Sequence, residues 1–429
     1  MKILDTSITY EIEPLLKPFG FKGGYLSQLW QVVAKVRGEN HEGVGVGVQS
    51  VLWADEAIFS GFSEREGNMY MYRVSEYALN LLRGREFANP IEATMTIFDN
   101  AYAFAKQITK NPHLLPTFTL NALVAVDNAL WQLYSKEKGE EDISLLVDGE
   151  TGKYLSGKQK LVYSIPLIGY KTSEEEIRCA AENGSFFLKV KVGSNPNGDG
   201  DLDSMLEWDK ARISEVHGVM KNFSTPYTDS GKCVYYLDAN GRYDTKDRLM
   251  RLLDHADKIG ALESIIILEE PFSEDNSVDV SDIPTLVTAD ESAYSLETTI
   301  RRLDQGYRAL ALKPIAKTVS ETLLIIKEAG KRGVHCFCAD LTVNPYMVDI
   351  NKNIAARISR FPGINIGIFE SNGAQNYKNW DRMKTYHPLY GKTSFSEPIR
   401  SVYSLDDEFY KISGGIYRDS AYYKNLGEK

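Results

Sequence analysis

The sequence is poor in cysteine and has no long apolar run, and both shortages narrow what the protein can be. Its 429 residues include four cysteines, too few and too scattered for a disulfide framework: Cys179, Cys233, Cys336 and Cys338. No stretch approaches the roughly 18 apolar residues that predict a membrane span. The N-terminus also lacks the basic segment and apolar run of a secretory signal. We therefore expect a cytoplasmic protein with no membrane partner.

Blocks of basic residues are missing as well. The chain has 59 acidic and 49 basic residues and a formal net charge of −10, so we expect no nucleic-acid partner. The apolar fraction of 43% and the charged fraction of 25% are typical of a globular protein. A chain of this length has room for a large core and two domains.

What is present is an alternation of short apolar runs with helical segments. Residues 1–135 mix strand-like runs with helices, which predicts an N-terminal α+β capping domain. Residues 136–395 hold eight strand-like runs, nearly all followed by a helix. This predicts a (β/α)8-type TIM barrel, in its regular or its modified (β/α)7β form. Residues 396–429 return to strand patterns and are expected to pack on the cap.

Three points of this pattern stay open. An open doubly wound sheet is the alternative fold, although no G-x-G-x-x-G or G-x-x-x-x-G-K-[ST] loop opens a helix after a strand. The helix expected after LEEP has the weakest signal. Segment 194–232, between the second and third predicted strands, is longer than usual, and its role is not apparent.

The predicted barrel strands carry their charged residues near their C-terminal ends. The strands are VYSIPLIG, FFLKVKVG, VYYLDAN, SIIILEEP, TLVTADES, RALALKP, VHCFCAD and INIGIFES. A single charged residue after a strand is usually solvated, but seven of these eight strands end in charge. In a barrel these ends meet at one mouth, where barrel active sites are built. The pattern therefore predicts a polar site there.

Alternation along the strands sharpens the set. Lys189 and Lys191 share one face of FFLKVKVG, which is unfavourable unless something opposes both charges. Asp238, Glu269 and Asp290 come from three successive strands, and three converging carboxylates stay ionised together only beside a cation. All-oxygen ligands favour a hard ion, Mg²⁺ first and Mn²⁺ next. The alternative is a metal-free network of salt bridges.

Several stretches, taken in order, resemble the motifs of one family. FLKVKVG resembles a K-x-K strand, LDANGRY a D-x-N strand, ILEEPF an E-x-P strand, TADES an A-D-E-S strand and ALKP a lysine strand. The helix AVDNALWQLYSKEKG resembles A-x-D-x-A-L-W-D-L-x-x-K, with Gln132 in place of an Asp. Together they resemble the mandelate racemase/muconate lactonizing enzyme branch of the enolase superfamily over most of the chain. One departure is the lack of a His–Asp dyad on the sixth and seventh strands, since the sixth offers Lys313 and His335 begins the seventh.

The resemblance implies roles for the residues at the mouth. It implies that Mg²⁺ is bound by Asp238, Glu269 and Asp290. It implies that Lys191 and Lys313 are acid/base groups on opposite faces of the substrate, with Lys189 holding the substrate carboxylate or lowering the pKa of Lys191. Further polar contacts to the substrate are expected from Asn240, Asp340, Glu370 and Asn372.

The resemblance also implies that two loops of the first domain close over the barrel mouth. Segments 18–30 and 48–59 match these loops. Their aromatic side chains are candidates for covering an apolar substrate: Phe19, Phe21, Tyr25 and Trp53. Packing between the domains explains these aromatics equally well. The family resemblance further implies a homo-oligomer.

We therefore expect a magnesium-dependent isomerase or lyase, similar to muconate lactonizing enzyme, that acts on a small-molecule carboxylate. It would remove the proton α to the carboxylate and form an enediolate. Racemisation or epimerisation, cycloisomerisation and elimination, including acid-sugar dehydration, all remain open. A barrel glycosidase using Asp238 and Glu269 leaves the lysines unexplained. A non-catalytic binding protein leaves the whole acid/base set unexplained.

Overall fold

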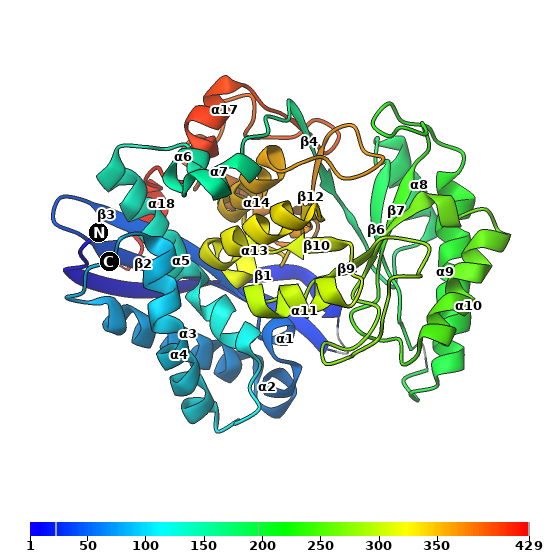
Figure 1. Ribbon diagram of the computed structural model, residues 1–429, viewed down its shortest axis with the longest axis horizontal. Coiled ribbons are helices and arrows are strands. Elements are labelled where there is room, and N and C mark those ends of the chain that lie inside the picture. The colour runs from blue at the N-terminus through cyan, green and yellow to red at the C-terminus, as the bar shows by residue number, and fades with distance from the viewer. Residues whose placement is uncertain (22–23, 196, 428–429) are drawn as a thin grey trace.

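The computed structural model describes residues 1–21, 24–195 and 197–427, with the backbone alone at Phe21. Its strands form a three-stranded antiparallel sheet near the N-terminus and a ten-stranded sheet that makes the barrel. In Figure 1 the small sheet and its helices occupy one end of the molecule, and the barrel with its outer helices occupies the other. The predicted TIM barrel with an N-terminal α+β cap is confirmed.

The N-terminal sheet contains a glycine–valine repeat that lets a helix lie close to it. The strand order is β1–β2–β3, with bounds β1 (Asp5–Phe21), β2 (Gly24–Arg37) and β3 (Glu42–Gln49). Valines and glycines alternate along β3 and so point to opposite faces. Helix α5 (Pro116–Lys138) packs on the glycine face, where a Cβ at Gly43 or Gly45 would lie 2.0 or 2.1 Å from a carbonyl oxygen of α5. Larger residues there would push the helix off the sheet.

The remaining helices of the N-terminal half begin with side-chain caps in most cases. Their bounds are α1 (Val51–Ala54), α2 (Glu56–Gly61), α3 (Glu64–Leu82), α4 (Pro90–Thr109), α6 (Ile143–Leu146) and α7 (Gly149–Tyr154). Helix α3, for example, begins with a capping box in which Ser63 and Glu66 each accept the other's backbone N–H. In the described ranges, no helix is both long enough and apolar enough to cross a membrane.

The barrel closes through its first strand, which Pro166 divides into two halves. The strand bounds are β4 (Leu161–Ile165), β5 (Leu167–Ile168), β6 (Phe187–Lys191), β7 (Val234–Asp238), β8 (Ile265–Glu269), β9 (Val287–Ala289), β10 (Ala309–Leu312), β11 (His335–Cys338) and β12 (Gly367–Glu370). The order is β4–β12–β11–β10–β9–β8–β7–β6–β5. Because β4 pairs in parallel with β12 and β5 pairs in parallel with β6, the two halves complete the ring. Each of the eight predicted barrel strands is therefore present.

Helices cover the outside of the barrel with one gap. Their bounds are α8 (Glu174–Glu182), α9 (Leu202–Met220), α10 (Lys246–Lys258), η1 (Leu262–Ser264), α11 (Leu296–Asp304), α12 (Pro314–Lys317), α13 (Val319–Arg332), α14 (Pro345–Arg357), α15 (Gly373–Asn376) and α16 (Trp380–Lys384). Residues 270–286, all of them described, contain no helix, so the helix expected after LEEP is wrong. This stretch has prolines near both ends and no helical apolar period.

The first predicted closing loop is a hairpin rather than a loop. Segment 18–30 spans the end of β1 and the start of β2, where pairing resumes at Phe19 and Leu26 after an irregularity that follows Pro14. The second predicted loop, segment 48–59, includes the end of β3 and the short helices α1 and α2. Strand pairing thus gives the cap a more regular edge at the mouth than the sequence pattern indicated.

The C-terminal segment contacts the barrel first and the cap last. Its elements are β13 (Val402–Ser404), α17 (Asp407–Lys411), η2 (Ser413–Gly415) and α18 (Ala421–Lys424). Strand β13 pairs antiparallel with β4, whereas α18 lies beside the N-terminal sheet in Figure 1. The hydroxyl of Tyr422 donates to Glu11 on β1 at 2.6 Å. The domain boundaries after residues 135 and 395 stay predictions.

Candidate active site

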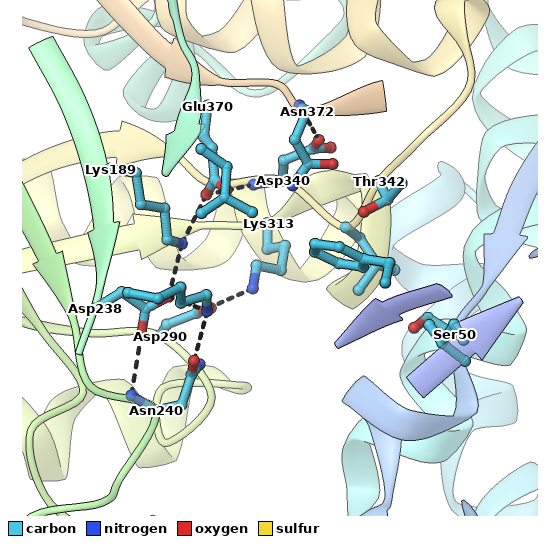
Figure 2. A pocket seen from close by; sticks show the side chains of 15 residues that line it. Ser50, Lys189, Asp238, Asn240, Asp290, Lys313, Asp340, Thr342, Glu370 and Asn372 are labelled. Atoms are coloured by element: carbon cyan, nitrogen blue, oxygen red, sulfur yellow. Dashed lines mark hydrogen bonds and ion pairs between the residues drawn. The ribbon is translucent and has the colours of Figure 1, made fainter. Parts of the chain in front are cut away.

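The C-terminal ends of the barrel strands surround a pocket, which the cap covers (Figure 2). The barrel side of its wall holds most of the predicted polar residues: Lys189, Lys191, Asp238, Asn240, Asp290, Lys313, Asp340, Glu370 and Asn372. The cap contributes Phe19, Leu26 and Ser50. The pocket thus has a charged barrel side and a largely apolar cap side.

The two lysines of β6 are both held by carboxylates. Lys189 Nζ contacts three of them: Asp238 Oδ2 at 2.8 Å, Glu269 Oε1 at 3.3 Å and Glu370 Oε2 at 2.8 Å. Lys191 Nζ donates to the same Asp238 Oδ2 at 2.6 Å. Parallel pairing brings them together, because Lys191 lies opposite Asp238 in the register of β6 and β7. The like charges on one strand face are therefore opposed by carboxylates from neighbouring strands.

These contacts set the charge of both partners. Burial lowers the pKa of Lys189, but its three carboxylate neighbours outweigh burial and raise that pKa well above its ordinary value. Burial likewise raises the pKa of Asp238, but Lys189 and Lys191 outweigh it and bring the pKa to about 2. Lys189 and Asp238 are therefore ionised throughout the physiological range.

Glu269 lies next to Lys189 at the end of β8. The hydroxyl of Tyr236 donates to Glu269 Oε2 and accepts from Lys189 Nζ at 2.9 Å. Burial is the main reason why the pKa of Glu269 is raised to about 7; Lys189 opposes this rise and Asp290 adds to it. A buried carboxylate so close to taking up a proton is one that a bound cation would stabilise.

Asp290, after β9, is held by two further ammonium groups. Lys313, the residue before α12, contacts Asp290 Oδ2, and Lys317, the last residue of α12, donates to Asp290 Oδ1 at 3.0 Å. Burial raises the pKa of Asp290, but the two lysines outweigh it and hold the pKa below its usual range. Burial lowers the pKa of Lys313, but Asp290 and its neighbours raise it overall. Lys313 lines the pocket, whereas Lys317 is 1% exposed and lies behind it.

Three carboxylates lie close enough to share one cation. Oxygens of Glu269, Asp290 and Glu291 are all within 4.8 Å of one another, and the three side chains are buried. The predicted set has Asp238 in place of Glu291, and Asp238 contacts the same Lys189 Nζ as Glu269. The donors are carboxylate oxygens, and burial raises the pKa of Glu269. The residues present therefore fit a hard divalent cation.

Glu270 directly follows β8 and has a φ of 38°, so it lies outside the regular strand. Its Oε2 accepts the backbone N–H groups of Asp290 and Ser292 at 2.8 and 3.1 Å. Burial, followed by the charge of Glu291, raises the pKa of Glu270 to about 8. Glu270 therefore holds the turn that presents Asp290 and Glu291.

The last two barrel strands supply a polar wall opposite the cap. Glu370 Oε2 accepts the backbone N–H of Asp340 at 3.2 Å, and Asp340 Oδ2 accepts the backbone N–H of Asn372 at 2.8 Å. Burial, followed by the charge of Glu370, raises the pKa of Asp340 to about 6. Thr342 beside them has a φ of 56°, a left-handed conformation that is rare for a β-branched residue. These residues stay candidates for contact with the substrate.

Two of the aromatic candidates from the cap are not part of the pocket wall. Trp53 is buried, and its ring centroid lies 4.9 Å from Lys313 Nζ, so it covers that lysine from the side. Tyr25 is 59% exposed. Phe19 and Leu26 of the same hairpin line the pocket instead. The side chain of Phe21 lies outside the described residues.

Three residues of the site were not among the sequence candidates. Lys317 reaches Asp290 because α12 is helical and places Lys317 one turn after Lys313. Strand alternation does not predict a contact with this four-residue spacing. Glu291 follows the end of β9, where alternation no longer decides the direction of a side chain. Tyr236 shares its strand face with Asp238 at period two, so its position was predictable.

Comparison with known proteins identifies relatives by structure only. No protein-family model and no curated protein matches the sequence. The L-Ala-D/L-Glu epimerase from Bacillus subtilis matches with a TM-score of 0.63 at 19% identity, covering 95% of this chain and 97% of that one. The dipeptide epimerase from Enterococcus faecalis V583, complexed with Mg and the dipeptide L-Leu-L-Tyr, matches with a TM-score of 0.65 at 16% identity, covering 95% and 98%.

A mandelate racemase/muconate lactonizing protein from Herpetosiphon aurantiacus matches with a TM-score of 0.62 at 16% identity, covering 95% of this chain and 96% of that one. At identities this low the likeness is one of fold. The chain therefore shares the capped-barrel fold of these proteins, which is the fold that its motifs predicted.

Proposed function

We propose that this protein is an enolase-superfamily enzyme that removes the proton α to the carboxylate of a small molecule and returns a proton to the same carbon. The outcome is racemisation or epimerisation. The observation that carries the proposal is the arrangement of Lys191 and Lys313, which both line the pocket. Strands β7, β8 and β9 separate β6 from β10 in one direction around the ring, and β11, β12 and the divided first strand separate them in the other. The two lysines therefore come from opposite walls.

A base on one face and an acid on the other interconvert the two configurations of a carbon. One lysine, as the free amine, takes the α-proton and leaves the electron pair in an enediolate. The other lysine, as the ammonium, gives a proton to the opposite face, and the roles exchange for the opposite configuration. Lys189, two residues from Lys191, is held by three carboxylates that raise its pKa well above the ordinary value, so Lys191 and Lys313 are the lysines assigned to proton transfer.

We assign Mg²⁺ to Asp238, Glu269 and Asp290, with Mn²⁺ as the second option. A divalent ion there counters the negative charge that develops on the substrate carboxylate as the proton leaves. The protein's own contribution is control of lysine protonation. Carboxylates around Lys313 raise its pKa. If a bound cation offset the charge of those carboxylates, the effect of burial on Lys313 would be left. Burial lowers the pKa of a lysine towards the value that a base needs.

Dipeptides are the first substrates to test. The Enterococcus faecalis enzyme is complexed with L-Leu-L-Tyr, and a dipeptide epimerase from Cytophaga hutchinsonii is complexed with D-Ala-L-Val. In the present pocket, Asp340 and Asn372 offer polar groups while Phe19 and Leu26 offer apolar ones. This combination supports a substrate with a polar backbone and an apolar side chain.

Other outcomes begin with the same step. Cycloisomerisation and elimination, including acid-sugar dehydration, also start by removal of an α-proton and differ in what happens to the enediolate. A glycosidase needs one carboxyl group protonated as the acid and the other ionised. The pKa values of about 2 for Asp238 and about 7 for Glu269 would allow such a division, but a glycosidase gives no role to Lys191 and Lys313, which line the pocket.

Deuterium exchange in the presence of metal tests the proposal. Dipeptides, other α-substituted carboxylates and acid sugars are incubated with the protein and Mg²⁺ in deuterated water, and the α-proton signals are followed by NMR. We expect loss of the signal for at least one substrate, and no loss after treatment with a chelator. Glycoside cleavage that survives chelation would identify a glycosidase. Binding of Mg²⁺ and carboxylates without any exchange would identify a binding protein.

A further inference from the structure

The carboxylate of Asp209 lies outside the pocket, behind the end of β6. Asp209 is in the middle of α9, within the long segment between β6 and β7, and its side chain is 0% exposed. A buried carboxylate is costly unless its oxygens are hydrogen-bonded. Its partners therefore indicate why it is there.

Those partners belong to the two turns that follow the acid/base and metal-site strands. Both oxygens of Asp209 accept the backbone N–H of Gly193 at 2.8 Å, two residues after Lys191. Asp209 Oδ2 also accepts the hydroxyl of Tyr243 at 2.6 Å, three residues after Asn240. One carboxylate thus joins the turn after β6 to the turn after β7.

The two turns pack closely against each other. Gly193 has a φ of 79°, and a Cβ there would lie 2.7 Å from Arg242 Cβ. The backbone N–H of Val192 donates to the carbonyl oxygen of Asp238 at 3.0 Å. The chain leaves Lys191 along a path that glycine alone tolerates well, and the hydrogen bonds to Asp209 hold it there.

We propose that Asp209 is a positioning residue for Lys191. It holds the turn after β6, and through that turn it keeps the amine of Lys191 at one face of the substrate. The inference rests on the proposed function, because it concerns one of the two lysines that exchange the α-proton. Lys313 does not depend on Asp209: its contacts in the described structure are with carboxylates after β9 and with the ring of Trp53.

This arrangement predicts a loss on one side only. An epimer whose α-proton faces Lys191 needs that amine within reach of the proton, and a small displacement of the base slows the transfer sharply. The opposite epimer gives its proton to Lys313, whose turn is not held by Asp209. A general loss of stability, by contrast, lowers both rates together.

The test compares initial rates of α-proton loss from the two epimers of one substrate in deuterated water. Asp209→Asn replaces one of the two acceptor oxygens with an NH₂ group, and Tyr243→Phe removes one of the donors without changing α9. Lys191→Ala identifies which epimer relies on Lys191. Asp349→Asn is the matched control, since Asp349 is a buried carboxylate paired with Lys352 and His387, away from these turns.

We expect Asp209→Asn to slow the epimer that relies on Lys191 at least about tenfold more than the other. Tyr243→Phe should shift the ratio in the same direction by less, and it decides the question if Asp209→Asn does not fold. Asp349→Asn should lower the melting temperature and leave the ratio unchanged. Equal slowing of both epimers in the Asp209 and Tyr243 variants would overturn this inference alone. Absence of exchange in the wild type would overturn the proposed function and this inference with it.

Discussion

The two sides of the pocket hold their lysines in different ways. On the β6 side, Lys189 and Lys191 come from a single strand and share one oxygen, Asp238 Oδ2. On the β10 side, Lys313 and Lys317 stand four residues apart around a short helix and take separate oxygens of Asp290. Each aspartate thus has two ammonium groups, but the geometry that brings them together is a pleat on one side and a helical turn on the other.

These two arrangements show how one lysine can become a free amine while the aspartate that it contacts stays ionised. In each pair one member has additional partners. Lys189 also contacts Glu269 and Glu370, and Lys317 also donates to the carbonyl oxygens of Asp290 and Ala293, at 2.6 and 3.3 Å. The other member of each pair, Lys191 or Lys313, has fewer partners; Lys189 also lines the pocket, whereas Lys317 does not. The committed lysine keeps the carboxylate charged when the other one becomes a free amine.

The largest expected effect is on the rate of α-proton exchange, after removal of the lysines assigned to proton transfer. We expect Lys191→Ala and Lys313→Ala each to lower α-proton exchange by about 10²–10⁴-fold for the epimer that it serves, because a positioned acid/base group contributes that much. Exchange is measured by NMR in deuterated water with each epimer separately. Exchange that survives both substitutions would remove the lysines from the assigned roles. Lys327→Ala, on the surface, serves as the control.

Removing Lys189 or Lys317, the lysines with additional partners, should show which side of the pocket contributes more to the free energy of unfolding. Lys189→Met leaves three buried carboxylates short of a partner, which we expect to lower the free energy of unfolding by about 3–5 kcal/mol. Lys317→Met should cost less, because Lys313 still contacts Asp290. Urea unfolding at neutral pH in the presence of a chelator measures both. A larger loss of stability for Lys317→Met than for Lys189→Met would show that leaving buried charge unpaired costs more on the β10 side.

Asp127 is a second buried carboxylate outside the pocket and can be compared with Asp209. Asp127 on α5 accepts from Thr94 at 2.7 Å and from the backbone N–H of Ser320 on α13 at 3.1 Å. Burial raises the pKa of Asp127 to about 6 from 3.8. Between these values the folded state holds a proton that the unfolded state has released. The free energy of unfolding therefore falls by up to about 3 kcal/mol as the pH rises from about 4 to about 6.

In Asp127→Asn this fall should be missing. Urea unfolding of the wild type and the variant at several pH values from 4 to 7 measures the contribution of Asp127 together with its effect on Glu321, whose raised pKa is mainly due to burial and in part due to Asp127. Parallel pH profiles for the two proteins would contradict the prediction.

The smallest expected effect concerns the third metal ligand. Asp238 lines the pocket, whereas Glu291 accepts from Asn240 Nδ2 at 3.2 Å. We expect Glu291→Gln to weaken Mg²⁺ binding about 10–100-fold, the range typical of losing an outer partner, and Asp238→Asn to weaken it more. Titration calorimetry on the metal-free protein measures both. The opposite order would assign the ion to the cluster of Glu269, Asp290 and Glu291.

Strand alternation and the rule that barrel ends meet at one mouth were sufficient to predict most of the site. Lys189, Lys191 and Asp238 meet because parallel register and a period of two leave no other arrangement. Glu269 and Asp290 follow from the same rules applied to the next two strands. These rules use local spacing alone, so a single sequence carries the information.

What could not be predicted depends on structure outside the strands. Lys317 reaches Asp290 through a four-residue helix that begins only after Lys313. Asp209 and Gly193 are separated by 15 residues, and their contact depends on where α9 packs, beside α8 and α10. Segment 18–30, which includes the ends of β1 and β2, was expected to be a closing loop because the family resemblance implies one there. Cross-strand pairing makes it a hairpin instead.

The contact between α18 and the N-terminal sheet has a consequence for biosynthesis. Tyr422 covers Glu11, and Lys35 Nζ donates to the carbonyl oxygen of Lys424 at 2.5 Å. During translation the first strand leaves the ribosome long before these residues exist, so the earliest part of the chain must wait for the latest part to complete its surroundings. A stop codon that removes only the final helix would therefore disturb the packing of the N-terminal sheet.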